Sequence, residues 1–475
     1  MSERVDLRNT PGACRVAIIG GGPGGLMTAY RLQQRCSARF EATIYEASSR
    51  LCGKVLTKQF SSAPVAYEAG AAELYDYSQT GEDPLRELID ELGLTVKPMN
   101  GASVVIDNQV LHDLDDVGRV YGESTRQALL AFDTRARQWM SPQEYYDADW
   151  QDSNADPMAG RTFYDELAQV EGEAARRYLR TLVHSDLATE PHRTSAAYGL
   201  QNYLMNDPSY MRLYTIDGGI ERLPQELAAR IEARVLLREP VVRVERAGDS
   251  TLRISSNRHG KVVTDEYDFV VVALPNACVP LIEWAGESLG QAMHRHCVHY
   301  DYPAHYLRVS VLFREVFWES SFQDSYMMLD AFGGCCLYDE SSRNGCRTHG
   351  VLGWLLAGDA AMIAANHTDE QLIRRVLDSL PSFLQRGREL FVEGQVHRWI
   401  DSVNGMPGGS PVLDMDRRHV PEPARPNLFA VGDYLFDSTI NGVLDSADYV
   451  AECLIEAIES RSRSQVPITA CSAAL

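Results

Sequence analysis

Five glycines and a proline follow one another near the N-terminus, as Gly20-Gly21-Gly22-Pro23-Gly24-Gly25. The apolar run 15–19 before them is typical of a buried parallel strand, and the segment 26–34 after them is expected to be helical. In the pattern G-x-G-x-x-G, the first glycine permits a tight turn, the second lets the backbone approach a pyrophosphate, and the third allows close helix–strand packing. The pattern is met by Gly20, Gly22 and Gly25. The run therefore predicts a dinucleotide site at the start of an α/β fold.

A second strand is expected at 42–46, and it ends on Glu46, 21 residues after Gly25. Strand, helix and strand then form one unit of about 30 residues. A carboxylate at this position accepts hydrogen bonds from ribose hydroxyl groups and disfavours a 2′-phosphate. This unit alone leaves NAD and FAD open as cofactors.

The residues from Glu46 to Val55, with the sequence EASSRLCGKV, resemble the E-x₃-R-x-G-G-R-V stretch of the flavin-containing amine oxidoreductase family. That family includes monoamine, polyamine and L-amino-acid oxidases, and it is related to phytoene-desaturase-like flavoproteins. The resemblance implies that the cofactor is FAD. The contacts that it implies in this stretch are Glu46, Ala47, Gly53 and Lys54.

Further segments resemble the same family, in the order in which the family has them. The segment 67–72 looks like the family's extended segment beside the flavin, which implies cofactor contacts by Gly70, Ala71 and Ala72. Val241 lies in the segment that resembles the strand whose backbone meets the adenine. The other matches are Asp217 to Leu223, Phe269 to Pro275, Phe429 to Asp433 and Gly442 to Ala447. The contacts implied near the C-terminus are Gly432, Asp433 and Ile440.

The strand pattern and the resemblance together predict an α/β fold with two domains. One is a Rossmann-like FAD-binding domain on a discontinuous, doubly wound parallel sheet, and the other is an α+β substrate domain. Charged helix-forming stretches fill 81–208, and strands alternate in 299–395. The predicted FAD-binding domain comprises 12–75, 209–298 and 420–465. The predicted substrate-binding domain comprises 76–208 and 299–419, and 462–475 is expected to be a flexible tail.

Four positions depart from the family's motifs. Cys52 and Ala447 each stand where the family has a glycine, Lys54 replaces an arginine, and Asp433 replaces a glutamate. A lysine keeps the positive charge near the pyrophosphate but lacks the bidentate fork of an arginine. An aspartate at position 433 is also found in the phytoene-desaturase-like relatives. These departures concern the subfamily more than the cofactor.

Arg308 stands where the family places a lysine that reaches flavin N5 through a water molecule. An arginine cannot act as a base there, because its pKa stays above about 12. Three roles are open for it: to hold a water, to stabilise an anionic flavin, or to bind a substrate carboxylate. The alternative is a structural arginine that pairs with a surface acid.

Trp399 resembles the tryptophan that precedes the flavin-attachment loop of monoamine oxidases. The following residues 402–409 contain no cysteine, so we expect FAD to be bound non-covalently. Amine-oxidising members of the family often frame the amine with two aromatic rings, one near Trp399 and one at the position of Thr439. Thr439 is not aromatic, and Phe436 or Tyr434 are the candidates to replace it.

These residues favour an FAD-dependent oxidoreductase acting on a small amine or an amino-acid-like metabolite. A hydride would pass to flavin N5, and oxygen would accept the electrons to give hydrogen peroxide. A desaturase that forms C=C bonds in secondary metabolism and a non-oxidative flavoprotein isomerase are the alternatives. The histidines and the cysteine between 294 and 305 match no standard ligand spacing, so we expect no metal site. Cys335 and Cys336 are interpreted as packing residues, because adjacent cysteines rarely form a good disulfide.

Composition narrows the choice of partners. A net charge of −21 and a pI near 5.0 argue against nucleic acid, because an acidic surface repels phosphate. The sequence lacks a run of about 18 apolar residues, so no membrane span is expected. It has no apolar signal segment at its start, and its ten scattered cysteines fit reduced thiols. We therefore expect a cytoplasmic protein that acts on a small molecule, and a homodimer stays open.

Overall fold

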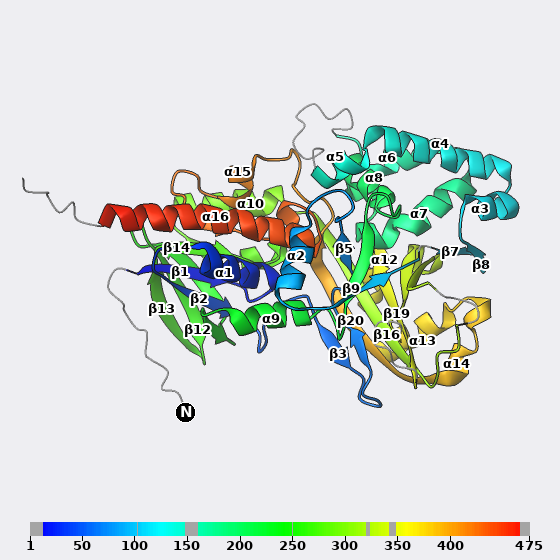
Figure 1. Cartoon of the computed structure of the whole chain (residues 1–475), viewed down its shortest axis with the longest axis horizontal. Coiled ribbons are helices and arrows are strands. Elements are labelled where there is room, and N and C mark those ends of the chain that lie inside the picture. The colour runs from blue at the N-terminus through cyan, green and yellow to red at the C-terminus, as the bar shows by residue number, and fades with distance from the viewer. Residues whose placement is uncertain are drawn as a thin grey trace, which may run out of the picture.

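The structure is a computed structural model, and Figure 1 shows its two halves side by side. The residues that it describes are 13–101, 103–147, 160–248, 250–319, 324–341 and 348–465. One half is built around a parallel sheet, and the other around a larger, mainly antiparallel sheet. The predicted tail 462–475 lies mostly outside the described residues.

A five-stranded parallel sheet, in the order β10-β2-β1-β14-β21, forms the centre of the first half. Its strands are β1 (Cys14–Ile19), β2 (Phe40–Glu46), β10 (Arg234–Leu237), β14 (Phe269–Val272) and β21 (Leu428–Ala430). They come from three separated stretches of the chain. This confirms the predicted α/β fold with a discontinuous parallel sheet.

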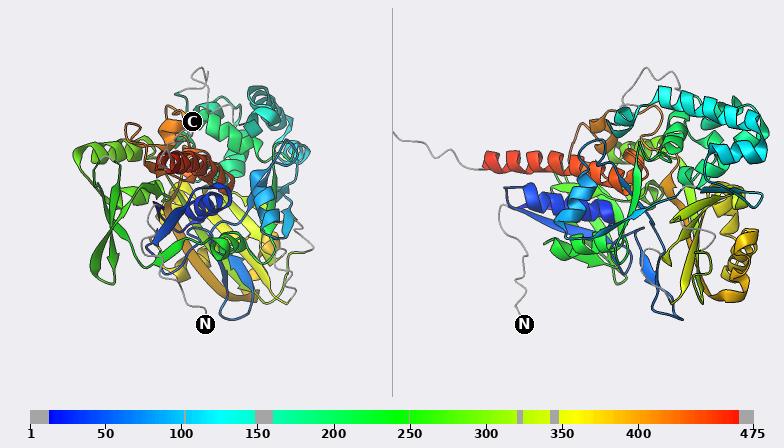
Figure 2. Two further views of the ribbon diagram at one scale, coloured as in Figure 1. Left: turned by 60° about the vertical axis from the view of Figure 1, so that its left-hand side comes forward. Right: turned by 45° about the vertical axis from the view of Figure 1, so that its right-hand side comes forward.

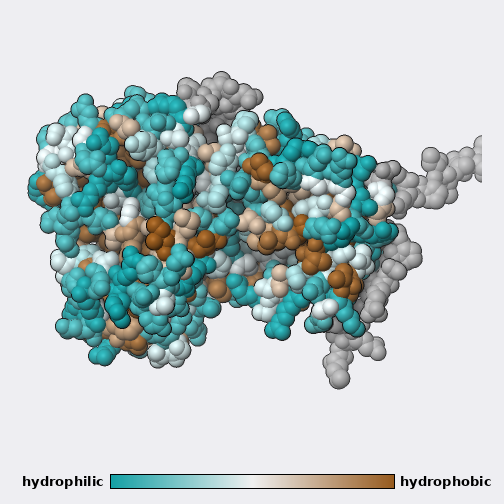
Figure 3. Space-filling view, turned by 180° about the vertical axis from the view of Figure 1, so that it is seen from behind, coloured by the Kyte–Doolittle hydropathy of each residue, from teal (hydrophilic) through white to brown (hydrophobic). Residues whose placement is uncertain are grey.

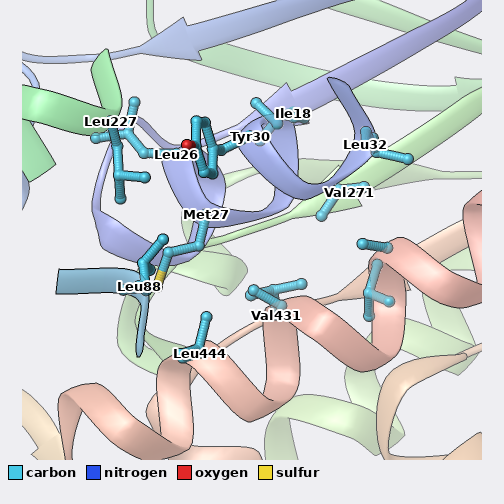
Figure 4. Packing of buried hydrophobic residues seen from close by; sticks show 14 of the residues in the cluster. Ile18, Leu26, Met27, Tyr30, Leu32, Leu88, Leu227, Val271, Val431 and Leu444 are labelled. Carbon is cyan, nitrogen blue, oxygen red and sulfur yellow. The ribbon is translucent and has the colours of Figure 1, made fainter. Parts of the chain in front are cut away.

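Both faces of this sheet are buried, which explains why its strands are continuous apolar runs. Val16 and Ile18 of β1 pack on the face that is covered by α1 (Pro23–Arg35) and α16 (Ile440–Gln465). Figure 4 shows Ile18 and Val271 of the sheet in this core. Ala17 and Ile19 belong to a different core on the opposite face. The elements there are β11 (Val241–Arg246), β12 (Leu252–Arg258), β13 (Lys261–Tyr267), β15 (Glu283–Ala285) and α10 (Glu287–His299).

The second half is built on a seven-stranded sheet, in the order β20-β16-β19-β18-β17-β7-β8. Its strands are β7 (Ser103–Ile106), β8 (Gln109–Leu111), β16 (Pro303–Phe313), β17 (Tyr326–Leu329), β18 (Cys335–Asp339), β19 (Gly350–Ala357) and β20 (Phe391–Asn404). The helices on one side are α3 (Leu114–Tyr121), α4 (Glu123–Trp139), α5 (Pro142–Asp147), α6 (Phe163–Ala168), α7 (Glu173–Leu187) and α8 (Ala196–Leu204). Those on the other side are α12 (Gly358–Ala364), α13 (Asp369–Asp378) and α14 (Gly387–Leu390). Figure 2 shows this layering from two further directions.

Small elements join the two halves. A three-stranded sheet has the order β5-β9-β6, and β3 and β4 form a hairpin. The bounds of these strands are β3 (Thr57–Gln59), β4 (Ala66–Glu68), β5 (Leu74–Asp76), β6 (Val96–Met99) and β9 (Arg212–Ile216). The remaining helices are α2 (Pro84–Glu91), α9 (Arg222–Arg230) and α15 (Met415–His419). The elements α2, β5 and β9 lie between the two large sheets (Figure 1). The segment 70–91, which contains β5 and α2, therefore connects the first half to the second half.

Cys335 and Cys336 show how the second half packs. They are free thiols on neighbouring positions of β18, and their side chains enter two different cores, on opposite sides of the sheet. The interpretation of this pair as packing residues is therefore confirmed. None of the described helices has the length and apolar character needed to cross a membrane.

Candidate active site

A cavity of about 510 Å³ is lined by residues of both halves. The predicted residues in its wall are Gly20, Gly22, Pro23, Gly24, Glu46, Ala47, Gly53, Lys54, Gly70, Ala71, Ala72, Val241, Arg308, Trp399, Gly432, Asp433, Thr439 and Ile440. Gly25 lies just behind the wall, in contact with the carbonyl of Gly20. The fold thus gathers nearly all residues singled out in the sequence around one space.

The surface at the back of the molecule reflects this arrangement. Apolar side chains gather in a band that runs across the middle of that face, over both halves, while polar side chains cover most of the rest (Figure 3). Leu281 lines the cavity and is itself 79% exposed, so the cavity reaches the surface beside this leucine.

The glycine turn has the geometry that its sequence predicts. Gly20 has a φ of +113°, and a Cβ there would stand 2.3 Å from the carbonyl oxygen of Ala273. A Cβ on Gly25 would stand 2.1 Å from the carbonyl oxygen of Gly20, so the helix packs directly on the strand end. Around Gly22, by contrast, the nearest atom to an added Cβ is 3.7 Å away. Gly20 and Gly25 are therefore needed for the fold, whereas Gly22 lines the cavity and tolerates an added Cβ.

Helix α1 starts at this turn with no side chain capping its first N–H groups. Those groups, together with the positive end of the helix dipole, form an anion site. Glu46 lies beside it at the end of β2, where its two oxygens accept hydrogen bonds from the N–H groups of Gly21 (2.9 Å) and Ser48 (2.7 Å). A carboxylate has about four acceptor positions, so Glu46 is held in place and can still accept further donors. The wall at this end suits a pyrophosphate and a ribose.

Two departures from the family's motifs meet in one ion pair. The Lys54 Nζ lies 2.7 Å from the Asp433 Oδ2 and also donates a hydrogen bond to the carbonyl oxygen of Ser402. The side chain of Lys54 is 31% exposed and that of Asp433 is 11% exposed. The side chains of Lys54 and Asp433, of which the aspartate is shorter than the family's glutamate, thus fix each other's position in the cavity wall.

A second ion pair lies in the second half, on the seven-stranded sheet, and is fully buried. The Arg308 Nη2 donates to the Glu340 Oε1 at 2.7 Å, and the two side chains are 2% and 1% exposed. The other oxygen of Glu340 accepts the N–H of Glu68 at 2.7 Å. The guanidinium also lies 5.1 Å from the ring centre of Tyr338. A Cβ on Gly353 would stand 2.2 Å from the Glu340 Oε1, so this glycine makes the pair possible.

This pair excludes one of the alternatives for Arg308, a surface acid as its partner, and bears on another. Its partner is a buried acid rather than a surface acid, and the partner comes from the residue that follows β18. The guanidinium faces the cavity with its charge already balanced by Glu340. That arrangement weakens the case for Arg308 as a receptor of a substrate carboxylate.

The part of the cavity wall around Arg308 is called the substrate end. Several residues in this part of the wall were not predicted from the sequence. They are Glu73, Tyr75, Tyr306, Tyr338 and Leu355. Two of them carried a signal: Glu73 directly follows the predicted contact Ala72, and Tyr306 precedes Arg308 by two residues and so shares its face of the strand. Tyr338 carried none, because it reaches the wall through strand pairing that the sequence does not reveal.

The aromatic residues expected near the closing helix lie elsewhere. The hydroxyl of Tyr434 is hydrogen-bonded to His296 at 2.9 Å, within a buried cluster behind the cavity. Phe436 lines a separate chamber. Thr439 does line the cavity, and Trp399 is fixed there by a hydrogen bond from its Nε1 to the carbonyl oxygen of Ala69 at 2.6 Å. The aromatic wall therefore comes mainly from tyrosines of the β-sheets.

One carboxyl group lines the wall at the same end, and a second lies near it. Glu73 lines the wall, and Asp186 is enclosed nearby. Burial and the neighbouring Glu73 raise the pKa of Asp186 well above its usual range. Within the described parts of the chain, no three His, Cys, Asp or Glu side chains are grouped so that they could hold a metal ion. The substrate end thus has the carboxyl group of Glu73 and several tyrosine rings in its wall.

Two curated proteins are similar to this chain in sequence. Among curated proteins, the flavin-containing amine oxidase of Oncorhynchus mykiss is 24% identical over 287 residues, which are 55% of this chain and 50% of that protein. The L-amino-acid oxidase of Neurospora crassa is 23% identical over an alignment of 497 residues, which covers 88% of this chain and 68% of that protein. The chain therefore spans about half the length of the first relative and about two thirds of the second.

A solved structure and a family model extend the comparison. Cyclohexylamine oxidase from Brevibacterium oxydans IH-35A matches with a TM-score of 0.72 and 20% identity, covering 94% of this chain and 100% of that one. At this identity the likeness shows a shared fold. The model of the family "Flavin containing amine oxidoreductase" matches residues 23–455. With that match over most of its length, the chain belongs to the flavin-containing amine oxidoreductases.

Proposed function

We propose that this protein is an oxidase of small amines that holds FAD non-covalently in the cavity. When bound, the flavin supplies the hydride acceptor, and oxygen then takes the electrons to give hydrogen peroxide. One observation carries the choice of substrate. Both basic side chains in the cavity wall, Lys54 and Arg308, are ion-paired with acids of this chain.

The dinucleotide end fits FAD. The bare backbone of Gly22 in the cavity wall and the uncapped start of α1 suit the pyrophosphate, and the carboxylate of Glu46 suits a ribose. The absence of cysteine from the sequence 402–409 supports non-covalent binding. In this proposal the flavin end is formed by Gly70, Ala71, Ala72, Thr439 and Ile440, and the adenine end by Val241.

An amine is favoured over an amino acid because of the charges at the substrate end. The charge of Arg308 is already balanced by Glu340, so a substrate carboxylate there would add a second negative charge to a buried site that holds one positive charge, which is costly. A substrate ammonium instead meets the carboxyl group of Glu73 in the wall. The rings of Tyr306 and Tyr338 line the same space, and aromatic faces attract cations.

The wall residues then have separate roles. Arg308 provides a fixed positive charge and cannot take up a proton. Glu73 balances the charge of the ammonium and can accept its proton. Tyr306, Tyr338 and Trp399 exclude water from the reacting carbon and hold it against the flavin end of the cavity.

The proposal is tested with the FAD-loaded protein and pairs of substrates that differ only by an α-carboxyl group. Hydrogen peroxide should form with small primary amines and not with the matched amino acids. Peroxide from the amino acids alone would overturn the choice of substrate. Flavin bleaching only by the precursor of an unsaturated product would select the desaturase instead.

The same sample tests the linkage of the cofactor. After denaturation and filtration, the yellow colour should pass through the filter, and colour retained on the polypeptide would contradict non-covalent binding. The domain boundaries, a homodimer and a cytoplasmic location are also proposals that follow from the sequence. Limited proteolysis and sedimentation of the purified protein address the first two.

A further inference from the structure

A second chamber of about 250 Å³ lies next to the cavity. It is lined by the start of α2, by α5 and α8, and by the segment 436–445, and it opens to solvent at the exposed side chains of Glu82 and Asp445. Asn441 lines both spaces, so the two are neighbours across this residue. The polar side chains that matter in the chamber are Asp437, Asp445, Gln201 and Asn441. We call this space the distal chamber.

The distal chamber is lined by acidic side chains. Asp437 and Asp445 line it together with Glu82 and Asp83 from the start of α2. No lysine, arginine or histidine lies among its described lining residues. Asp83 is engaged as the cap of α2, where it accepts the N–H groups of Leu85 and Arg86. The acids left for a ligand are Asp445 and Asp437, and one oxygen of Asp437 also accepts the hydroxyl of Thr439 at 3.2 Å.

Two buried acceptors also lack a partner. Gln201 is only 6% exposed, and its Oε1 has no hydrogen-bond partner in the described part of the structure. The same holds for the Oδ1 of Asn441. A buried acceptor without a donor costs free energy, and such a group marks a place for a ligand or a water. Both acceptors lie in the wall of the chamber, so its ligand should donate hydrogen bonds.

The aromatic residues indicate which kind of donor fits. Tyr77, Tyr145 and Phe436 line the chamber together with the acids. Aromatic faces and carboxylates together bind organic cations such as alkylammonium and guanidinium groups. A cation that enters from the main cavity would pass Asn441.

We infer that the distal chamber binds a second cationic group of the substrate, so that the preferred substrate is a diamine or an amine with a guanidinium group. This inference rests on the proposed amine oxidation, which places the reacting amine in the main cavity. One end of the substrate then lies at Glu73 and the other between Asp437 and Asp445.

Recognition of the second cation should depend on pH. Burial, followed by the nearby Asp448, Asp437 and Asp83, raises the pKa of Asp445 to about 7. Burial also raises the pKa of Asp437 to about 6, with a smaller contribution from Asp433. The other ionisable groups that face them are Glu82, Tyr77, Tyr145 and Tyr146. Because a cation is attracted to the charged carboxylates, the preference for a diamine should grow as the pH rises through 6 to 7.

The test compares a linear diamine with the monoamine of the same chain length, using the FAD-loaded protein. Asp445→Asn should raise the KM for the diamine by roughly 10- to 100-fold, the loss expected for a hydrogen bond to a charged group. The KM for the monoamine should stay unchanged. Glu452→Gln serves as the control, because Glu452 is an exposed acid on the same helix and lies outside the chamber. An equal effect on both substrates would show that the chamber is only a passage, and would overturn the inference.

A binding measurement separates this inference from the proposed function. In dithionite-reduced, FAD-loaded protein no turnover occurs, so calorimetry reports binding of the diamine alone. Tight binding to the wild type that is lost in Asp445→Asn supports the chamber, even if no amine is oxidised. Oxidation of monoamines without any preference for the diamine would leave the proposed function intact and contradict this inference.

Discussion

The two ends of the cavity are built in different ways. The dinucleotide end is formed by backbone: a glycine turn, an uncapped helix start and a strand end, all within the first 46 residues. The substrate end is formed by side chains from β5, β16, β18 and β19, which lie far apart in the sequence. Each end holds one ion pair, Lys54–Asp433 or Arg308–Glu340, but only the second is fully buried. The dinucleotide end depends on the local shape of the backbone, whereas the substrate end depends on tertiary packing and on balanced charge.

The largest effect should come from breaking the buried pair. Glu340→Ala leaves the charge of Arg308 buried without a partner, and it should lower the free energy of unfolding by about 3–5 kcal/mol. Asp433→Ala at the other end should cost about 1 kcal/mol, because Lys54 can turn its charge to water. Urea unfolding of the cofactor-free proteins measures both.

A double variant controls this experiment. Arg308→Leu with Glu340→Leu removes both charges, so it should recover much of the stability that Glu340→Ala loses. Equal losses for Glu340→Ala and Asp433→Ala would contradict the distinction between the two ends.

The next effect concerns the glycine turn. Gly22→Ala should keep the stability of the cofactor-free protein, because an added Cβ would make only an ordinary van der Waals contact, 3.7 Å from the Cα of Gly53. It should weaken FAD binding by about 30-fold, or roughly 2 kcal/mol, by holding the phosphate away from the N–H groups of α1. Gly25→Ala should instead lower the stability itself, since its Cβ would overlap the carbonyl oxygen of Gly20. Fluorescence titration with FAD and thermal unfolding separate the two outcomes, and a Gly22→Ala protein with unchanged affinity would exclude Gly22 from the phosphate site.

How far each end could be predicted follows from the same comparison. The strands β1 and β2, the helix α1 and the glycine turn were predicted from contiguous residues, because their periodicity and glycine spacing are local. Glu340 was not predicted, although it balances Arg308, because the two meet only through the pairing of β16, β19 and β18. Gly353 was missed for the same reason: its role is visible only once Glu340 lies over it.

A smaller effect should appear in the pH dependence of stability. In the folded protein, burial raises the pKa of Asp445 to about 7, whereas an unfolded aspartate has a pKa of about 3.9. The folded state therefore binds this proton more tightly, so the contribution of Asp445 to the stability of the cofactor-free protein should be lost as the pH rises from about 4 to 7. His296, His397 and His419, whose pKa values burial lowers, act in the opposite direction, so the effect is measured as the difference between the wild type and Asp445→Asn in thermal unfolding across that range. An unchanged slope would show that Asp445 titrates normally.

The smallest effect should come from the strained residue of the nucleotide end. Cys52 has a φ of +78°, a conformation that favours glycine, and it occupies a position where the family has glycine. Cys52→Gly should therefore stabilise the protein by about 1 kcal/mol. Gly53→Ala is the matched control, because Gly53 also has a positive φ of +52° and should be destabilised by a side chain. A loss of stability in Cys52→Gly would show that packing of the thiol outweighs the backbone strain.

The central claim is that one cavity joins an FAD site to an acidic site for an amine. Anaerobic mixing of the FAD-loaded protein with a primary amine, and separately with its α-carboxylated counterpart, tests both parts at once. The visible absorbance of the flavin should bleach with the amine and persist with the amino acid. Bleaching by the amino acid alone would contradict the account, as would a protein that binds no FAD.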